Sequence, residues 1–501
     1  MNTLSYQTLE DMHYQGYLLR SAPERVLQFG EGNFLRAFTD DFIDRMNEQT
    51  DFCSKVVVCQ PRSSDPRNAD RLNAQEGLYT LLLRGFEGGQ PVSKKRIISC
   101  ISRCLNLHRD YDALMACANR PELRYVISNT TEAGIVYDPA CRMEDRPPAS
   151  FPAKLTQLLY RRFCTFGGQR SAGLVILACE LIEDNGKVLE DYVLRYAHAW
   201  KLGTGFVNWL REDNYFCSTL VDRIVTGFPR GEHEALTQEL GYLDELTDAC
   251  EPFGLWVIEG PDWLKDELPF EQAGLPVLIC NDHHPYKQRK VRILNGAHTA
   301  MVPGAFLAGR DIVRDCMEDP VIYRFMRGAV YEEILPGLTL PAQELANFAA
   351  SVEKRFGNPF IDHALLSICM NCTSKWKTRI LPSLKAYVSR FGRLPRRLTA
   401  SFAFYLAFYR SVRSEDNALI GLRGQEEYRI LDDQDILRFY ESQRDCTSAA
   451  YTHAVCTAVW LWGEDLSAIP GFEKEAAALL QRILSESVLE VMKSFDRTDN
   501  F

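Results

Sequence analysis

Three residues in the middle of the chain have side chains suited to moving a proton. Lys290, Asn295 and His298 lie in the segment KVRILNGAH. A partly buried lysine can act as a general acid or base when its pKa is lowered toward neutrality. An asparagine amide can donate a hydrogen bond to a developing oxyanion, and a histidine can orient the same oxygen. The segment predicts a metal-free site that moves a proton while a nicotinamide moves a hydride; the alternative is an amphipathic helix with solvated polar residues.

The geometry of a regular helix does not bring these three side chains together. At 3.6 residues per turn, Asn295 and His298 share one face, whereas Lys290 lies roughly 80° from His298 and about 140° from Asn295 around the axis. The three groups converge only if Lys290 uses its long side chain or if the helix has an irregular start.

A glycine-rich turn near the N-terminus is the second group of residues with a chemical use. The apolar run 25–29 leads directly into GEGNFLRAF, residues 30–38. A strand followed by Gly-x-Gly and a helix lets the backbone approach a pyrophosphate, which the helix N-terminus then binds. Leu35 stands where the usual fingerprint has its third glycine, and an ordinary tight turn is the alternative. The predicted cofactor-binding residues here are Phe29, Gly30, Gly32, Asn33, Phe34 and Arg36.

Two further loops are expected to line the same cofactor crevice. The run 55–59 is followed by Gln60 to Asp65, where Asp65 suits the ribose of NAD and Arg62 suits the 2′-phosphate of NADP, so the choice stays open. The loop 128–134 carries small and polar residues, among them Thr131 and Glu132, at the carboxyl end of another predicted strand. Ligands bind at such ends in open α/β sheets.

The elements that must position these residues change character along the chain. Six short apolar runs alternate with helical periodicity in the first half, which predicts crossover units around a mainly parallel sheet buried on both faces. After about residue 280 the strand signal fades. The predicted fold is α/β, with a Rossmann-type domain over 1–280 and an all-helical domain over 281–501. The runs lie at 25–29, 55–59, 124–128, 174–178, 255–258 and 275–279, and the later helices at 320–326, 341–356, 399–412, 435–442 and 472–495.

Composition excludes several classes of function. A net charge of -10 and a pI near 5.6 argue against a general nucleic-acid binder, although one small anion remains possible. No apolar run approaches the ~18 residues of a membrane helix, and the N-terminus lacks a secretory signal. The 16 cysteines are scattered, which is typical of reduced thiols in a cytoplasmic protein. Cys369 and Cys372 form a single Cys-x2-Cys motif, and the sequence offers no second pair of ligands to complete a zinc site. The sequence leaves the choice between monomer and dimer open.

Taken together, the two motifs resemble the mannitol dehydrogenase family. Gly-x-Gly-Asn-Phe-x-Arg-Ala-Phe and Lys-x4-Asn-x2-His carry the resemblance. It implies an NAD-binding Rossmann-type domain, Lys290 as the catalytic acid/base, and Asn295 with His298 as the groups that hold the reacting oxygen. Supporting matches occur in the family's order at 131–134, Asn185-Gly186, 221–224, Asn358-Pro359 and Lys375.

Within the family, segments 179–186 and 377–382 are most similar to members that act on a hexuronate. They imply NAD-dependent interconversion of D-tagaturonate and D-altronate; the alternatives are fructuronate or mannitol chemistry and, in another class, dinucleotide binding without catalysis. Lys375, Lys377 and Arg379 suit a substrate carboxylate. Leu181 replaces an asparagine that helps the oxyanion in mannitol dehydrogenases, and Asn185 is the candidate replacement. The implied substrate-binding residues are Asn185, Asp222, Lys375 and Arg379.

Overall fold

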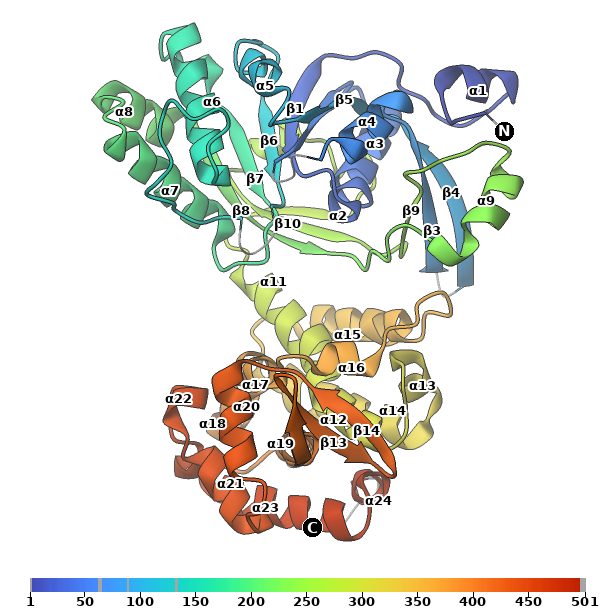
Figure 1. Cartoon of the computed structure of the whole chain (residues 1–501), viewed down its shortest axis with the longest axis vertical. Helices are drawn as coiled ribbons and strands as arrows, with labels where there is room; N and C mark the ends of the chain where they lie inside the picture. Colours follow the sequence, from blue (N-terminus) through green and yellow to red (C-terminus); the bar gives the residue numbers. More distant parts are fainter. Residues whose placement is uncertain (1, 62–64, 88–89, 131–133, 496–501) are drawn as a thin grey trace. The chain divides into compact units, whose positions relative to one another are not determined.

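The computed structural model describes residues 2–61, 65–87, 90–130 and 134–495, and the chain divides into two compact units, Met1–His283 and His284–Phe501. An eight-stranded sheet forms the centre of the first unit (Figure 1), with the order β11-β10-β8-β7-β6-β1-β2-β5. All neighbouring strands are parallel except β8 and β10, so the predicted mainly parallel sheet is confirmed. The strands are β1 Glu24–Phe29, β2 Lys55–Gln60, β5 Ile101–Asn106, β6 Tyr125–Ser128, β7 Val175–Ala178, β8 Tyr215–Asp222, β10 Leu255–Glu259 and β11 Val277–Cys280.

Apolar side chains of the central strands alternate between two cores. Val56 and Val58 of β2 face the core formed with α2 and α3, whereas Val57 and Cys59 face the core formed with α5 to α8. This alternation explains why the strands read as continuous apolar runs: both faces of the sheet are covered. The helices of this unit are α1 Tyr6–Asp11, α2 Asn33–Arg36, α3 Thr39–Gln49, α4 Arg67–Ala74, α5 Tyr111–Cys117, α6 Phe151–Phe166, α7 Asn185–Ala199, α8 Thr204–Asp213, α9 His233–Leu240 and α10 Leu264–Glu267.

A second, three-stranded sheet in the first unit was not predicted. It consists of β3 (Tyr79–Glu87) between β4 (Gln90–Ile98) and β9 (Asp248–Cys250). β3 pairs with β4 along its whole length as an antiparallel ribbon. Basic and polar residues occupy much of β4, and this composition hides the strand from a search for apolar runs.

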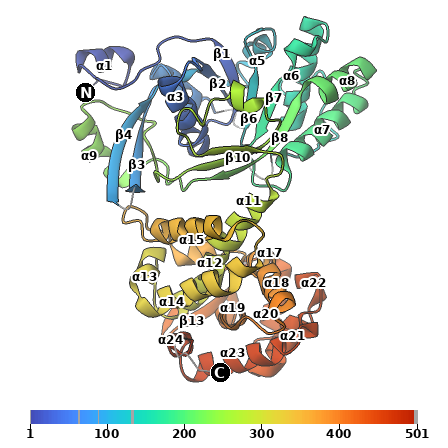
Figure 2. The ribbon, with the colours of Figure 1, turned by 180° about the vertical axis from the view of Figure 1, so that it is seen from behind.

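Helices dominate the second unit, and α12 is its central element (Figure 2). All residues from Gly296 to Phe306 are buried, and α12 packs against α16, α17 and α19. Asp319 caps α14 by accepting hydrogen bonds from the backbone of Val321 and Ile322, as expected for Asp-Pro at a helix start. The α-helices are α11 His284–Arg289, α12 Gly296–Leu307, α13 Val313–Glu318, α14 Pro320–Gly328, α15 Ala342–Phe356, α16 Leu365–Cys369, α17 Cys372–Arg379, α18 Leu381–Phe391, α19 Arg396–Phe408, α20 Gln434–Ser442, α21 Ser448–Cys456, α22 Val459–Trp462, α23 Phe472–Ser485 and α24 Val488–Lys493.

The expectation of an all-helical second unit needs one correction. β12 (Ser411–Glu415), β13 (Ala418–Arg423) and β14 (Glu426–Ile430) form an antiparallel sheet. Asp416 and Asn417 join the first two strands with φ values of 44° and 60°, the conformation that two-residue hairpin turns require. The outer strands β12 and β14 are short and largely exposed and lack the apolar runs of the first unit, whereas the middle strand β13 is mostly buried. Among the described residues, no helix combines the length and the apolar character needed to cross a bilayer.

Candidate active site

The glycine turn lies where three parallel strands end side by side. β1 runs between β2 and β6, and its last residue, Phe29, accepts a hydrogen bond from the backbone of Asn129 at 3.1 Å. Gly30 donates to the carbonyl of Cys59 at 2.9 Å. The backbone therefore leaves the sheet at the edge where open α/β sheets bind their ligands.

Gly30 and Gly32 meet different surroundings. Gly30 has a φ of 136°, and a Cβ there would lie 2.9 Å from Leu35 Cδ1 and 3.2 Å from Asn129 O, so only glycine fits. A Cβ on Gly32 would meet no atom within 4 Å, and its φ of -70° suits any residue. The protein itself therefore does not require a glycine at position 32. The open space in front of this backbone fits a ligand such as a pyrophosphate.

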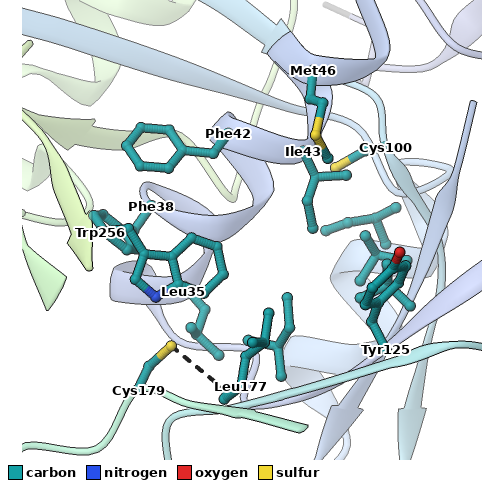
Figure 3. Packing of buried hydrophobic residues seen from close by; sticks show 14 of the residues in the cluster. Leu35, Phe38, Phe42, Ile43, Met46, Cys100, Tyr125, Leu177, Cys179 and Trp256 are labelled. Carbon is teal, nitrogen blue, oxygen red and sulfur yellow. Dashed lines mark hydrogen bonds between the residues drawn. The ribbon is translucent and has the colours of Figure 1, made fainter. Parts of the chain in front are cut away.

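Leu35, which replaces the third glycine of the fingerprint, is a core residue. Its side chain is buried in the cluster of Figure 3 with Phe38, Phe42 and Trp256. Phe34 stacks on Phe38 with ring centroids 5.1 Å apart. The start of this helix is therefore held by bulky apolar side chains instead of by the close backbone packing that a glycine allows.

Arg36, predicted to bind the cofactor, is bound by groups of its own unit. Its guanidinium donates to Asn33 Oδ1 at 2.7 Å and to the carbonyl of Leu246 at 2.5 Å, and it lies 3.6 Å from Asp248. These contacts fix the conformation of the turn that carries Asn33. Cofactor binding by Arg36 stays a prediction.

A cavity of about 470 Å³ opens beside the glycine turn and is large enough for half of a dinucleotide. It is polar, and basic groups outnumber acidic ones along its wall. Asp65 lies after β2 and accepts hydrogen bonds from the backbone and side chain of Arg67. Arg62, Thr131 and Glu132 lie outside the described residues. The lining residues of the cavity are Glu31, Gly32, Asn33, Arg36, Asn68, Arg71, Leu72, Phe228, Arg230, His233, Glu245 and Leu246.

The predicted catalytic segment contains an irregular turn. Residues Lys290–Asn295 form a π-helical turn between α11 and α12. Hydrogen bonds from i to i+5 bring Asn295 nearly above Lys290, whereas a regular α-helix would separate the two by about 140°. Such turns occur frequently at functional sites. The segment therefore contains the kind of irregular turn that brings Lys290 toward Asn295.

His298 follows on α12 and has an unusual environment. Its ring stacks on Phe356 with centroids 4.1 Å apart, and the ring of His363 meets it edge-on at 5.4 Å. Its Nε2 is buried without a hydrogen-bond partner. Burial, followed by the nearby bases His363, Arg379, Arg355 and Lys375, lowers the pKa of His298 well below its ordinary value. The imidazole is therefore neutral at pH 7, and its Nε2 is available to a bound oxygen.

The bases around His298 come from three segments, and we call Arg355, His363, Lys375 and Arg379 the basic cluster. Lys375 and Arg379 lie one turn apart on α17; Lys375 donates to the carbonyl of Ile368 at 2.8 Å. Burial lowers the pKa of both side chains, and the charge of Arg379 lowers that of Lys375 further.

Lys377 lies apart from the basic cluster. Its ammonium lies against Gly463, the residue after α22: a Cβ added to Gly463 would be 3.7 Å from the Lys377 Nζ. Arg355 and His363 were not predicted from the sequence. The only nearby signal was the family match Asn358-Pro359, which lies between them in the chain.

Asn185 occupies a structural position in the first unit. Its amide donates to the carbonyls of Glu180 and Thr219, at 2.9 and 3.0 Å, and its oxygen accepts from the backbone of Gly186 and Thr219. Both N–H donors are used. The expectation that Asn185 supplies the missing oxyanion donor finds no support in this arrangement. Leu181, at the position of the missing asparagine, is 65% exposed.

Asp222 is buried at the end of β8, and the next residue, Arg223, ties this strand to the rest of the unit. Arg223 donates to Asp41 Oδ2 and to the carbonyl of Ala37, both at 2.7 Å. The match to the family at 221–224 therefore includes a structural ion pair. Substrate binding by Asp222 stays a prediction.

Several possible metal ligands lie close together near the end of the first unit. Glu259, Asp282 and His283 offer ligand atoms within 4.8 Å of one another. His283 Nδ1 is 2.6 Å from Glu259 Oε2, and Lys187 pairs with the same carboxylate group at 2.8 Å. Within the described residues, no such group of ligands includes Cys369 or Cys372. Independence from metal ions stays a prediction.

Comparison with known proteins gives matches along nearly the whole chain. Residues 24–272 match the mannitol dehydrogenase Rossmann domain and residues 282–484 the mannitol dehydrogenase C-terminal domain. An altronate oxidoreductase of Pectobacterium atrosepticum is 47% identical over 491 residues, which cover 98% of this chain and 100% of the relative. That of Bacillus subtilis is 47% identical over 474 residues, 94% of each chain.

Two solved structures share the fold over both units. The mannitol 2-dehydrogenase of Pseudomonas fluorescens, solved with NAD and D-mannitol, has a TM-score of 0.73 at 22% identity and covers 99% of this chain and 100% of its own. A D-sorbitol dehydrogenase in substrate-free form has a TM-score of 0.79 at 21% identity, with 98% and 100% covered.

Proposed function

The chain belongs to the mannitol dehydrogenase family, and we propose from this premise that it is an NAD-dependent oxidoreductase that interconverts D-tagaturonate and D-altronate. The carrying observation is the 47% identity to altronate oxidoreductases over almost the full length of both chains. The basic cluster around His298 supports an anionic substrate, because buried bases are stabilised by an anion that they can hydrogen-bond.

The first unit is proposed to hold the dinucleotide at the glycine turn. The open space at Gly32, the close approach enforced at Gly30 and the adjoining cavity fit a pyrophosphate with a nucleoside. Asn33 and the strand-end residues Asn129 and Thr130 would contribute polar groups. When bound, the nicotinamide supplies or accepts the hydride.

Lys290 is proposed as the acid that protonates the reacting oxygen when the ketone is reduced, and as the base that removes this proton when the alcohol is oxidised. Hydride addition at the ketone carbon places an electron pair on the oxygen, and the ammonium of Lys290 neutralises it by transferring a proton. The π-helical turn supports this role by bringing Lys290 toward the face that carries Asn295.

Asn295 and His298 are proposed to hold the same oxygen. The amide of Asn295 donates one hydrogen bond, and the neutral imidazole of His298 donates a second from its otherwise unpartnered Nε2. A neutral imidazole leaves Lys290 as the proton donor. The low pKa of His298 therefore supports a division of roles between the two bases.

Reduction of D-fructuronate and oxidation of mannitol are the competing activities within the family. The side-by-side test measures NADH oxidation with D-tagaturonate, D-fructuronate and D-fructose. We expect the highest kcat/KM for D-tagaturonate. A higher value for either other ketose would overturn the assignment, and no NADH consumption with any of them would favour a binding module without catalysis.

The reaction is proposed to take place in the cytoplasm. All 16 cysteines lie in the described residues and are free thiols, most of them buried, which supports a reducing compartment.

A further inference from the structure

A buried carboxylate joins the ends of two neighbouring strands of the central sheet. Glu180, two residues after the end of β7, is 2% exposed. Its Oε1 accepts hydrogen bonds from the backbone N–H and from the hydroxyl of Thr130, both at 3.0 Å. Its Oε2 accepts a third from the hydroxyl of Ser128 at 3.1 Å. The side chain therefore uses both of its oxygens to hold the end of β6.

The register of the two strands explains why a side chain at position 180 reaches this end. β6 and β7 are parallel, and Ser128 pairs with Ala178. Two residues farther along each chain, Glu180 follows in register with Thr130. Gly134 also lies directly against Thr130, because a Cβ there would be 2.1 Å from Thr130 Oγ1 and 2.4 Å from its carbonyl oxygen. Thr130 is therefore held both by a carboxylate and by close backbone packing.

The contact with Glu180 also fixes the direction of the Thr130 hydroxyl. A hydroxyl has one proton to donate, and here the carboxylate accepts it. The backbone N–H of Thr130 donates to the same oxygen. Burial raises the pKa of Glu180, and the hydrogen bonds from Thr130 and Ser128 act against this rise. Any ligand that meets the Thr130 hydroxyl therefore meets it as a hydrogen-bond acceptor.

The order of the strands assigns this edge of the sheet to one half of the cofactor crevice. From β1 the chain continues to β2 and β5 on one side and to β6, β7 and β8 on the other. A dinucleotide binds across the point where the strand order reverses, and the residue that meets the adenosine ribose follows the second strand. Asp65 follows β2 in this chain. The ends of β6 and β7 therefore belong to the half that receives the nicotinamide.

Resting on the proposed function, we propose that Glu180 is a positioning residue for the cofactor, because it holds Thr130 in the orientation that binds the nicotinamide end of NADH for hydride transfer. An acceptor at Thr130 suits the carboxamide NH₂ group and the ribose hydroxyls, which are the donors of that end. Glu180 acts through Thr130 and takes no part in the proton transfer proposed for Lys290.

The test titrates Glu180→Ala and Glu180→Gln with NADH and with ADP, which lacks the nicotinamide end. Glu180→Ala is expected to raise the Kd of NADH about 10-fold and to leave the Kd of ADP within about twofold of wild type. Its kcat for D-tagaturonate at saturating NADH is expected to fall about 10- to 100-fold, because a displaced nicotinamide transfers hydride slowly. In Glu180→Gln the amide oxygen can accept from Thr130 while its NH₂ donates to Ser128, so both properties should recover to near wild type.

A double-mutant cycle shows whether Glu180 acts through Thr130. Thr130→Val removes the hydroxyl and keeps the shape of the side chain. If the two residues form one unit, their losses of NADH affinity do not multiply, and the double variant matches Glu180→Ala within about twofold. Glu212→Ala is the control, because this exposed carboxylate at the end of α8 precedes β8 and so belongs to the opposite edge of the sheet. It should bind both nucleotides as wild type does.

The outcomes separate this proposal from the proposed function. Equal weakening of ADP and NADH in Glu180→Ala, a Glu180→Gln variant as impaired as Glu180→Ala, or losses that multiply in the cycle would each overturn the positioning role. If Glu180→Ala does not fold, Glu180→Asp, which is one methylene shorter, replaces it in the same titrations. A wild type that binds NADH without reducing D-tagaturonate overturns the proposed function instead, and the nucleotide titrations then still decide the role of Glu180.

Discussion

Both units pair buried arginines with acidic side chains, but the surroundings of His298 in the second unit differ from these pairs. Arg223 and Asp41 are 1% and 0% exposed and 2.7 Å apart, and Arg36 lies 3.6 Å from Asp248. In the second unit, the side chains whose charges lower the pKa of His298 most are the bases His363, Arg379, Arg355 and Lys375. A paired arginine holds two elements of the fold together, whereas several bases gathered around one imidazole are stabilised when an anion binds. The comparison separates buried charge that maintains structure from buried charge that suits the binding of an anion.

The largest expected effect comes from Lys290→Met in the second unit. Removal of the proposed acid/base is expected to lower kcat for D-tagaturonate about 10²- to 10⁴-fold, the usual contribution of a general acid. Thermal unfolding and NADH binding, followed by fluorescence, are expected to stay near wild type, because neither property depends on proton transfer. Lys287→Met, about one turn earlier on α11, is the control. Substantial residual turnover in Lys290→Met would remove Lys290 from the mechanism.

The opposite result is expected for Arg223→Met in the first unit: the free energy of unfolding falls, whereas kcat of the folded protein does not. The substitution removes the closer partner of the buried Asp41 and leaves only Arg45, 3.9 Å away, which costs up to about 3–5 kcal/mol. Urea unfolding followed by circular dichroism measures the loss. Arg223→Met combined with Asp41→Asn should recover part of it. Arg482→Met, which removes an exposed pair with Glu486, should cost at most about 1 kcal/mol. Equal losses for the buried and exposed pairs would contradict the distinction.

Asp40 makes the stability of the first unit depend on pH. Burial, as the largest cause, raises its pKa from 3.8 to about 7. Between these values the folded chain keeps a proton that the unfolded chain has lost, so the contribution of Asp40 to stability is greatest below pH 4 and falls as pH rises to 7. At 1.36 kcal/mol per pH unit the loss reaches up to about 4 kcal/mol.

Asp40→Asn should remove this contribution, because an amide oxygen can still accept the hydrogen bond from Gln28. We expect the variant to be more stable than wild type at pH 8 and to have a flatter profile of melting temperature between pH 5 and 8. A profile that is as steep as that of the wild type would show that other groups, such as Asp248 with its pKa of about 6, dominate.

Much of the fold and the proton-transfer segment could be predicted from local pattern. Apolar runs located six of the eight strands of the central sheet, because strands buried on both faces leave an unbroken signal; β5 and β8, whose sequences are interrupted by polar residues, were not predicted. The ribbon β3–β4 and the hairpins at 411–430 were not predicted either: β4, β12 and β14 are largely polar or exposed, although β3 and β13 carry short buried apolar runs. The Asp416-Asn417 turn was the one local clue to the latter.

The surroundings of His298 could not be predicted from the sequence. Arg355 and His363 become neighbours of His298 only through the packing of α15 and its following loop against α12. Asn185 is a residue that the sequence did single out, through its match to the family. Only the structure shows that both N–H groups of its amide already bind backbone carbonyls, of Glu180 before α7 and of Thr219 in β8. Spacing along the chain carries neither kind of information.

The smallest expected effect comes from the glycine turn of the first unit, where Gly30 is required by the fold and Gly32 is not. Gly32→Ala places a methyl group in the space that meets no protein atom, so the fold is not strained and is expected to gain about 0.4–1 kcal/mol from the reduced freedom of the unfolded chain. The same methyl group occupies the proposed pyrophosphate position and is expected to weaken NADH binding about 10-fold, measured by titration of nucleotide fluorescence. Gly30→Ala meets Leu35 and the backbone of Asn129 and should lower the melting temperature. If Gly32→Ala bound NADH as tightly as wild type, the open space at this turn would not be the cofactor's.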